Sequence, residues 1–291
     1  MQPESLLNQR STEFGIYLKS NDYSERSIQT YLFHLTKLRS LYNIDEFGYS
    51  DVIRVISNPD YSLRYRQVIV AALKQYYYFL MWKGIRDNHP CPNLRIRSNF
   101  GKNYLQQDFL SSNELMLLRS REQRYSALEL RDQVLLSLLT IQALSPSELV
   151  RVDVQHVNIH FGKLFVPGSR KYKRRSLNLL KDQRELFDRY INEAREKLIK
   201  EPTQALIIGM SGKRISSDSI HYVVSTMKSM VPNKNITPSM IRQSVISWWI
   251  NELKIPLEQA QLMSGHRWIS STQKYEFRRP EDDLILVNRW Q

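Results

Sequence analysis

The chain has 291 residues, of which 42% are hydrophobic, and a formal net charge of +13. This length suggests one large or two ordinary domains, and this hydrophobic fraction excludes disorder throughout the chain. A cationic surface of this size attracts polyanions, because each phosphate contact releases condensed counterions. The charge therefore favours a nucleic-acid partner, although a soluble protein can be basic without one.

Several classes of protein are excluded or disfavoured by simple features of the sequence. The single cysteine, Cys91, excludes an intramolecular disulfide and a cysteine-built zinc site. Apolar runs such as residues 134–141 are too short to span a bilayer. The N-terminus lacks a charged start followed by an apolar core, so we expect no secretory signal and a cytoplasmic, nucleoid-associated protein.

Residues 1–97 predict a helical N-terminal domain. The segment from Ser24 to Ser27 offers an N-cap ahead of an apolar stripe at 28–38, and residues 61–80 give a second stripe at helical spacing. The aromatic run at 76–79 continues that stripe, which favours core packing over base stacking for most of it. The helical pattern ends at Gly84 and the Pro-Cys-Pro stretch of residues 90–92.

Residues 98–107 predict a linker, because the chain from 95 to 107 is polar and basic and has no strong period. Arg95, Arg97 and Lys102 would suit a segment lying along a DNA backbone. A linker that is merely solvated explains these residues equally well.

Residues 108–291 predict a second domain with a C-terminal tail. A helix start at 109–111, a buried helix at 131–144 and a helix opening at Pro146 are followed by short strands between 157 and 180. Ile159 and Phe161 belong to the first of these expected strands, and helices resume from Asp182. The predicted fold class is therefore mainly α with a small β-sheet, arranged as two domains.

The most informative motif lies between residues 239 and 275. Arg242 is followed by Ser244, then by a helix pair, then by Gly265 and His266, and Tyr275 stands nine residues after the histidine. This order and spacing resembles the signature half of the tyrosine recombinases, the integrase and Xer-like enzymes. Each motif is weak alone, but their order and spacing together are specific.

The resemblance extends backwards over nearly the whole chain and carries expectations about fold and function. It implies a two-domain clamp on duplex DNA, with a helical DNA-binding domain and a mixed α/β catalytic domain. It also implies that DNA is cut and rejoined through a covalent 3′-phosphotyrosine, with Tyr275 as nucleophile and Arg242 and His266 at the scissile phosphate.

Elementary chemistry is consistent with these roles. A tyrosine hydroxyl with a pKa near 10 needs a neighbouring base or cationic field to attack at neutral pH. Arginine supplies paired donors matched to a phosphate and stays charged. The tyrosyl–DNA bond conserves the energy of the broken bond, so neither ATP nor a metal or other cofactor is required. The glycines at 209–213 are too closely spaced for a phosphate-binding loop.

Five cations fall within residues 170–175, at a predicted turn between strands. The family places its lysine, the general acid for the leaving 5′-oxygen, on such a hairpin. Alignment from Leu179 puts Arg170 at that position, but arginine is a poor acid, so we select the adjacent Lys171. The remaining cations are expected to contact DNA phosphates: Arg170, Lys173, Arg174 and Arg175.

Two positions depart from the family pattern. Ser145 replaces the first arginine of the G-L-R-x-S-E-L motif, and Ser239 replaces the first histidine of the H-x-L-R box. Loss of one preorganised donor typically costs about 10² to 10³ in rate, which does not abolish a reaction whose nucleophile remains. Four other cations are candidates to replace the arginine: Arg151, Arg170, Lys173 and Arg267.

The resemblance also implies partners. These are double-stranded DNA, a homotetramer that synapses two sites, and possible accessory recombinases or DNA-bending proteins. Residues 281–291 would pack on a neighbouring protomer or on their own domain. The alternative hypothesis is a catalytically degenerate recombinase fold that acts as an architectural or regulatory DNA-binding protein. A helix-turn-helix regulator would explain the charge but not the spacing from Arg242 to Tyr275.

Overall fold

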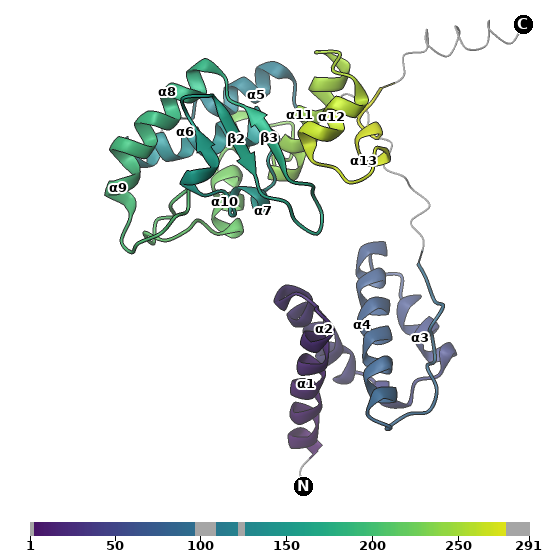
Figure 1. Ribbon diagram of the computed structural model, residues 1–291. Helices are drawn as coiled ribbons and strands as arrows, with labels where there is room; N and C mark the ends of the chain where they lie inside the picture. Colours follow the sequence, from purple (N-terminus) through teal and green to yellow (C-terminus); the bar gives the residue numbers. More distant parts are fainter. Residues whose placement is uncertain (1–2, 97–108, 122–125, 278–291) are drawn as a thin grey trace, which may run out of the picture. The chain divides into compact units, whose positions relative to one another are not determined.

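The computed structural model describes residues 3–96, 109–121 and 126–277, which form two compact units divided between residues 101 and 102 (Figure 1). The predicted linker at 98–107 lies outside the described residues, and so do Arg97, Lys102 and the C-terminal segment 281–291. In the described ranges, no helix combines the length and the apolar character needed to cross a bilayer.

The first unit is entirely helical in its described part. Its elements are α1 (Pro3–Ser20), α2 (Glu25–Arg39), the 3-10 turn η1 (Ile44–Glu46), α3 (Tyr49–Ile56) and α4 (Leu63–Trp82). Ser24 caps α2 as predicted, because its hydroxyl accepts a hydrogen bond from the Ser27 amide. Ser62 caps α4 in the same way.

The aromatic run of α4 packs into the core of the first unit, as predicted for most of its members. Tyr76, Tyr77 and Phe79 are fully buried, whereas Tyr78 is 40% exposed. The buried hydroxyls have partners, since Tyr77 donates to the Ile44 carbonyl at 3.0 Å and Tyr76 contacts Asp45 and Arg39. These rings therefore hold α4 against its neighbours.

The second unit is mainly helical with a small sheet, which confirms the predicted fold class. Its helices are α5 (Ser112–Arg119), α6 (Ser126–Thr140), α7 (Pro146–Leu149), α8 (Lys181–Arg189), α9 (Arg195–Leu198), α10 (Ser217–Ser225), α11 (Pro238–Asn251), α12 (Leu257–Ser264) and α13 (Ser270–Gln273). Short turns complete it: η3 (Val154–His156), the π-helical η4 (Tyr190–Ala194) and η5 (Lys228–Met230).

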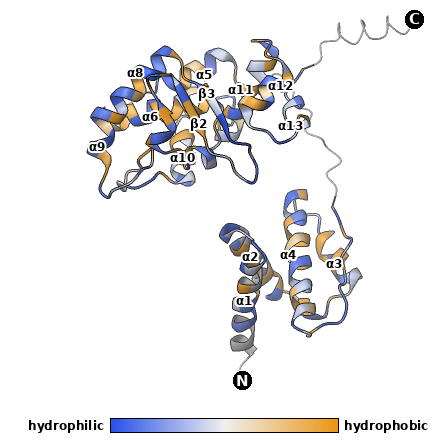
Figure 2. Cartoon of the chain, viewed as in Figure 1, coloured by the Kyte–Doolittle hydropathy of each residue, from blue (hydrophilic) through white to orange (hydrophobic). Residues whose placement is uncertain are grey.

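The sheet is antiparallel in the order β1 (Val157–Asn158), β2 (Lys163–Val166), β3 (Arg175–Asn178). The prediction was wrong for Ile159 and Phe161, which lie in the turn between β1 and β2. The Phe161 amide donates to the Asn158 side chain, and Gly162 has a φ of +60°, so the chain turns too early for β1 to reach them. Figure 2 shows that the loop joining β2 to β3 is hydrophilic.

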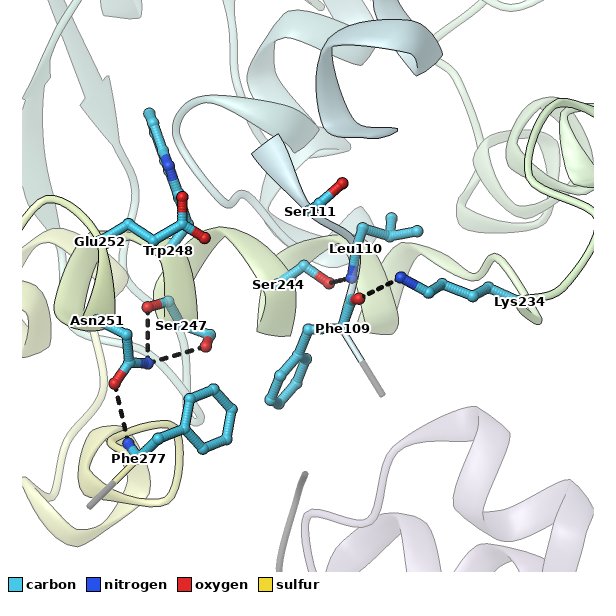
Figure 3. A pocket seen from close by; sticks show the side chains of 10 residues that line it. All are labelled: Phe109, Leu110, Ser111, Lys234, Ser244, Ser247, Trp248, Asn251, Glu252 and Phe277. Carbon is cyan, nitrogen blue, oxygen red and sulfur yellow. Dashed lines mark hydrogen bonds between the residues drawn. The ribbon is translucent and has the colours of Figure 1, made fainter. Parts of the chain in front are cut away.

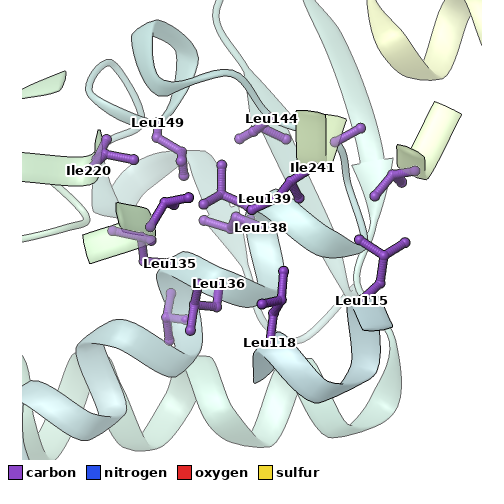
Figure 4. Close-up of a cluster of buried hydrophobic side chains, with 14 of the residues drawn as sticks. Leu115, Leu118, Leu135, Leu136, Leu138, Leu139, Leu144, Leu149, Ile220 and Ile241 are labelled. Carbon is purple, nitrogen blue, oxygen red and sulfur yellow. The ribbon is translucent and has the colours of Figure 1, made fainter. Parts of the chain in front are cut away.

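Helix α6 forms the centre of the second unit's core (Figure 4). Leu135, Leu136, Leu138 and Leu139 are at most 1% exposed and pack with leucines of α5 and with Ile241 of α11. The predicted helix at 131–144 ends four residues early, at Thr140. The remaining residues turn the chain toward α7, where Ser145 is the N-cap and Pro146 occupies the first turn as predicted.

Candidate active site

Helix α11 places Arg242 one turn inside its N-terminus. The Thr237 side chain accepts a hydrogen bond from the Met240 amide, and Pro238 occupies the first turn, so the start of the helix is fixed. Arg242 is 6% exposed. Its guanidinium donates to three acceptors, which are the Ala143 carbonyl, the Ser264 carbonyl at 2.5 Å and the Glu148 carboxylate at 3.2 Å.

Glu148 of α7 is completely buried between two arginines. Its Oε1 lies 2.5 Å from Arg175 Nη1, and its Oε2 lies 3.2 Å from Arg242 Nη1. The Ser145 amide and hydroxyl also donate to Oε2, at 2.9 and 2.7 Å. Burial raises the pKa of Glu148, but the charges of Arg242 and Arg175 outweigh this effect and lower it. Glu148 is therefore ionised, and the trio keeps one net positive charge.

Gly265 ends α12 and brings His266 into this cluster. Its φ of +72° is the left-handed cap conformation, and its amide donates to the Gln261 and Leu262 carbonyls. A Cβ at this position would stand 2.5 Å from Arg175 Nη1 and 3.0 Å from the Lys173 carbonyl. Only glycine suits the position, because both the backbone conformation and the close approach exclude a side chain.

His266 is 8% exposed, and its Nδ1 lies 2.9 Å from the Thr272 hydroxyl. Burial lowers the pKa of His266 to about 4, and the nearby charges of Arg242 and Arg175 contribute to the shift. At neutral pH the imidazole is therefore uncharged. Because Thr272 occupies Nδ1, the Nε2 atom is the one left to face a substrate.

Tyr275 follows α13, and its ring lies beside that of His266. The two ring centroids are 6.3 Å apart and the ring planes differ by 29°, while Phe109 meets Tyr275 edge-on at 6.0 Å. Asn251, at the end of α11, donates to the Tyr275 carbonyl at 2.7 Å and accepts from the Phe277 amide at 2.9 Å. The Asn251–Phe277 contact is drawn in Figure 3. Asn251 thus fixes the backbone on which Tyr275 stands.

The loop between β2 and β3 docks onto the same segment. The Lys173 amide donates to the Gly265 carbonyl at 2.8 Å, and Tyr172 pairs with His266 in an isolated β-bridge. Arg267 donates to the Ser169 carbonyl at 2.9 Å. This places the predicted basic run at the edge of the cluster, with these members exposed: Arg170, Lys171, Lys173 and Arg174.

Arg175 does not have the surface position expected of a DNA contact. It lies in β3, is 9% exposed, and uses its guanidinium to bind Glu148 and the Met263 carbonyl. The sequence predicted that all the cations of residues 170–175 contact DNA from one hairpin turn, whereas Arg175 belongs to β3, where the strand alternation turns it inward. Arg175 supports the buried cluster instead.

The two altered family positions have ordinary structural roles. Ser145 caps α7, and its hydroxyl donates to Glu148, while Ser239 is exposed on the first turn of α11. Among the proposed substitutes for the missing arginine, Arg151 and Arg267 donate to backbone carbonyls of the β2–β3 loop. Their guanidiniums therefore hold the loop in place.

Further predicted DNA contacts are only partly described. Arg95 is exposed near the end of the first unit, and its contact with DNA stays a prediction. The structure also reveals contributors that the sequence reading missed: Tyr172, Thr272 and Asn251. For Glu148, the spacing of three residues after Ser145 was the available sequence signal, since it is the spacing of a capping box.

A cavity of about 460 Å³ opens beside α11, on the side shown in Figure 3. Lys234 crosses it to reach the Phe109 carbonyl at 2.6 Å, and the Leu110 amide donates to Ser244 at 2.8 Å. Arg242, His266 and Tyr275 do not line this cavity. The cavity instead adjoins the residues that support Tyr275, because Asn251 and Phe109 line it.

Residues 108–281, more than half of the chain, match the phage integrase family. The chain belongs to this family of tyrosine recombinases. Among curated relatives, tyrosine recombinase XerD of Staphylococcus epidermidis is 33% identical over 148 residues, which cover 50% of this chain and 49% of the relative. XerD of Oceanobacillus iheyensis is 28% identical over 212 residues, covering 71% and 68%. The first of these matches thus spans about half the length of the relative.

Solved structures show the same fold at low sequence identity. XerH recombinase bound to a palindromic difH substrate, in a post-cleavage complex, has a TM-score of 0.71 at 14% identity, covering 94% of this chain and 82% of that one. A lambda integrase dimer bound to a COC′ core site has a TM-score of 0.68 at 13% identity, covering 96% and 97%. The tyrosine recombinase fold therefore extends over nearly the whole chain.

Proposed function

We propose that this chain is a site-specific DNA recombinase that cuts and rejoins duplex DNA through a covalent 3′-phosphotyrosine on Tyr275. The observation that carries the proposal is the meeting of Arg242, His266 and Tyr275. They come from the start of α11, the end of α12 and the segment after α13, and they gather around one buried cationic cluster. Membership of the phage integrase family supports the same reaction class.

Each group has a task in the proposed reaction. The Tyr275 oxygen attacks the scissile phosphorus, a bond to the 3′-phosphate forms, and the bond to the 5′-oxygen breaks. Arg242 stabilises the charge that develops on the non-bridging oxygens, as preorganised donors do in a site shielded from water. The net positive charge left by Arg242, Arg175 and Glu148 favours an incoming phosphate.

Two proton transfers accompany the exchange. When the Nδ1 hydrogen is donated to the Thr272 hydroxyl, neutral His266 can accept a proton at Nε2, which an imidazolium could not do. Burial is the main cause of its low pKa, and a bound phosphate opposes the further contribution of the charges of Arg242 and Arg175. The leaving 5′-oxygen takes a proton from Lys171, whose exposed side chain stands on the β2–β3 loop. The reverse transfers religate the strand.

The proposed partners are duplex DNA and three further copies of the chain. The solved relatives include a lambda integrase tetramer bound to a Holliday junction and XerH bound to difH DNA. The exposed cations of the β2–β3 loop and the +13 net charge suit a DNA backbone. Accessory recombinases or DNA-bending proteins would complete such an assembly.

The test is covalent trapping on nicked DNA drawn from sequences that flank the gene. Wild-type protein is expected to become attached to a 3′-phosphate, and Tyr275→Phe is expected to form no adduct. Tyr222→Phe, at a tyrosine 68% exposed on α10, controls for the loss of a hydroxyl elsewhere. An adduct that persists in Tyr275→Phe would refute the assignment of the nucleophile.

A second candidate function is a DNA-binding protein with a degenerate active site. The observation that favours it is the pair of serines at the altered positions, since the Ser145 hydroxyl is bound to Glu148 and Ser239 is a small exposed residue. This candidate predicts specific DNA binding without any covalent adduct in the same assay.

A further inference from the structure

We infer that Tyr172 is a positioning residue for Arg242: its ring holds the plane of the arginine that would clamp the scissile phosphate. The inference rests on the proposed function of this site. The Arg242 Cζ atom lies 4.5 Å from the centroid of the Tyr172 ring. This is well within the range of a cation–π contact, and Arg242 is buried while Tyr172 is half-buried, which strengthens the attraction relative to an exposed pair.

The geometry leaves Arg242 able to bind phosphate. A guanidinium donates hydrogen bonds in its plane, whereas a cation–π contact uses its face. In the plane, Nη1 donates to Ala143 and Glu148, and Nη2 donates once, to Ser264. Among the described residues, the Nε hydrogen and the second Nη2 hydrogen have no hydrogen-bond partner. Tyr172 thus covers a face while donors for a phosphate oxygen remain in the plane.

The position of the Tyr172 ring is fixed by its backbone. The Ser169 amide donates to the Tyr172 carbonyl at 2.8 Å, and the Tyr172 amide donates to the Ser169 hydroxyl at 2.9 Å. The bridge between Tyr172 and His266 then ties this tight turn to the end of α12. The same ring lies 6.3 Å from that of His266, so one side chain adjoins both phosphate-facing groups.

The missing arginine at position 145 gives this contact its importance. When two arginines bind the same phosphate, each partly fixes the orientation of the other, because both donate to the shared anion. Here Ser145 supplies no cation and is bound to Glu148, and the neighbouring Arg175 is engaged with Glu148 and the Met263 carbonyl. The Tyr172 ring fills that role of orientation, although it supplies no charge.

The ring, and not the hydroxyl, carries the proposed effect. Among the described residues, the Tyr172 hydroxyl makes no hydrogen bond, whereas its ring contacts Arg242 and His266. Phenylalanine at this position should therefore preserve the function, and an aliphatic residue of similar size should not. This distinction separates positioning by the ring from simple packing.

The test compares Tyr172→Leu, Tyr172→Phe and wild type in single-turnover covalent cleavage of nicked DNA. Loss of a cation–π contact is expected to slow cleavage about tenfold in Tyr172→Leu, with DNA affinity within about twofold of wild type, and Tyr172→Phe should recover most of the rate. Phe161→Leu, at an exposed ring 70% accessible in the β1–β2 turn, is the matched control and should cleave as wild type does.

A second readout does not depend on cleavage. Orthovanadate mimics a phosphoryl group in transfer. Its binding to the protein without DNA is measured for wild type, both Tyr172 variants, Arg242→Gln and the double variant Arg242→Gln/Tyr172→Leu. We expect Tyr172→Leu to bind orthovanadate more weakly than wild type and Tyr172→Phe to recover the affinity, whereas Tyr172→Leu should make no difference once Arg242 is replaced by glutamine. Thermal denaturation checks that each variant is folded.

The outcomes separate this inference from the proposed function. If wild type forms no adduct, the proposed function fails, and the vanadate series alone decides the role of Tyr172. Equal vanadate affinity in wild type, Tyr172→Phe and Tyr172→Leu would overturn the inference. Faster cleavage in Tyr172→Leu would also overturn it, because it would show that the ring obstructs the site.

Discussion

At the scale of single residues, the site depends on charges that are buried but compensated. Glu148 alone would be costly to bury, and so would Arg242 or Arg175, but together they satisfy one another. His266 is kept neutral mainly by its burial, and the charges of Arg242 and Arg175 lower its pKa further. The net positive charge of the site therefore lies on arginine side chains that are largely shielded from water.

The pKa of His266 predicts a pH-dependent stability. It is lowered to about 4 in the folded chain, against about 6.5 in an unfolded one. Between these values the unfolded state binds more protons, so this contribution to the free energy of unfolding is present above pH 6.5 and lost as the pH falls toward 4. The difference is on the order of 3 kcal/mol.

Urea denaturation of wild type and His266→Gln at pH 7 and pH 4.5 measures this contribution. The variant should lose less stability than wild type over that interval, because it has no imidazole to protonate when it unfolds. His160→Gln, at an exposed histidine in the β1–β2 turn, should keep the wild-type dependence. An unchanged dependence in His266→Gln would rule out a buried neutral imidazole.

At the scale of elements, the site can form only because the backbone at the end of α12 turns in the left-handed conformation of Gly265. Gly84 and Gly265 both have a positive φ, but only Gly265 is crowded by a side chain and a carbonyl. Gly84→Ala should cost about 1 kcal/mol, the usual strain of alanine in the left-handed region. Gly265→Ala should cost several times more, because Arg175 must also move.

Thermal or chemical unfolding of the two glycine variants checks this prediction, with Gly84→Ala as the control for strain alone. Gly265→Ala should also lose covalent cleavage, since Arg175 and His266 both shift. Equal destabilisation in the two variants would show that the close approach of Arg175 to Gly265 has no energetic consequence.

The elements also show what the sequence could predict and why. The helix starts at Ser24, Ser111 and Pro146 were predictable because their signals are local, and the order of Arg242, His266 and Tyr275 matched a known spacing. The end of α6 was not predictable, because it depends on Ala143 adopting a φ of +53° to present its carbonyl to Arg242. Contacts across long sequence distances, such as Tyr172 with Arg242, leave no local signal.

At the scale of the whole molecule, the charge predicts salt-sensitive DNA binding. Each phosphate contact that is lost should reduce the slope of log K against log salt by about one. The test variant replaces three exposed cations of the β2–β3 loop by alanine: Arg170, Lys171 and Lys173. Its slope should therefore be smaller than that of wild type by up to about three.

The control for this prediction removes the same charge from another surface. Lys181→Ala, Arg189→Ala and Lys197→Ala, all at exposed positions of α8 and α9, should change the slope less. Fluorescence anisotropy of labelled duplex DNA over a salt series measures both triple variants. Equal slopes in the two would place the DNA away from the β2–β3 loop.

The most direct test of the central claim is peptide mapping of the trapped protein–DNA adduct by mass spectrometry after nuclease digestion. The account predicts a nucleotide joined through a 3′-phosphate to the peptide that contains Tyr275, at the Tyr275 oxygen. A nucleotide on any other residue would contradict the account. Tight, specific binding that never yields an adduct would instead support a DNA-binding protein built on a recombinase fold.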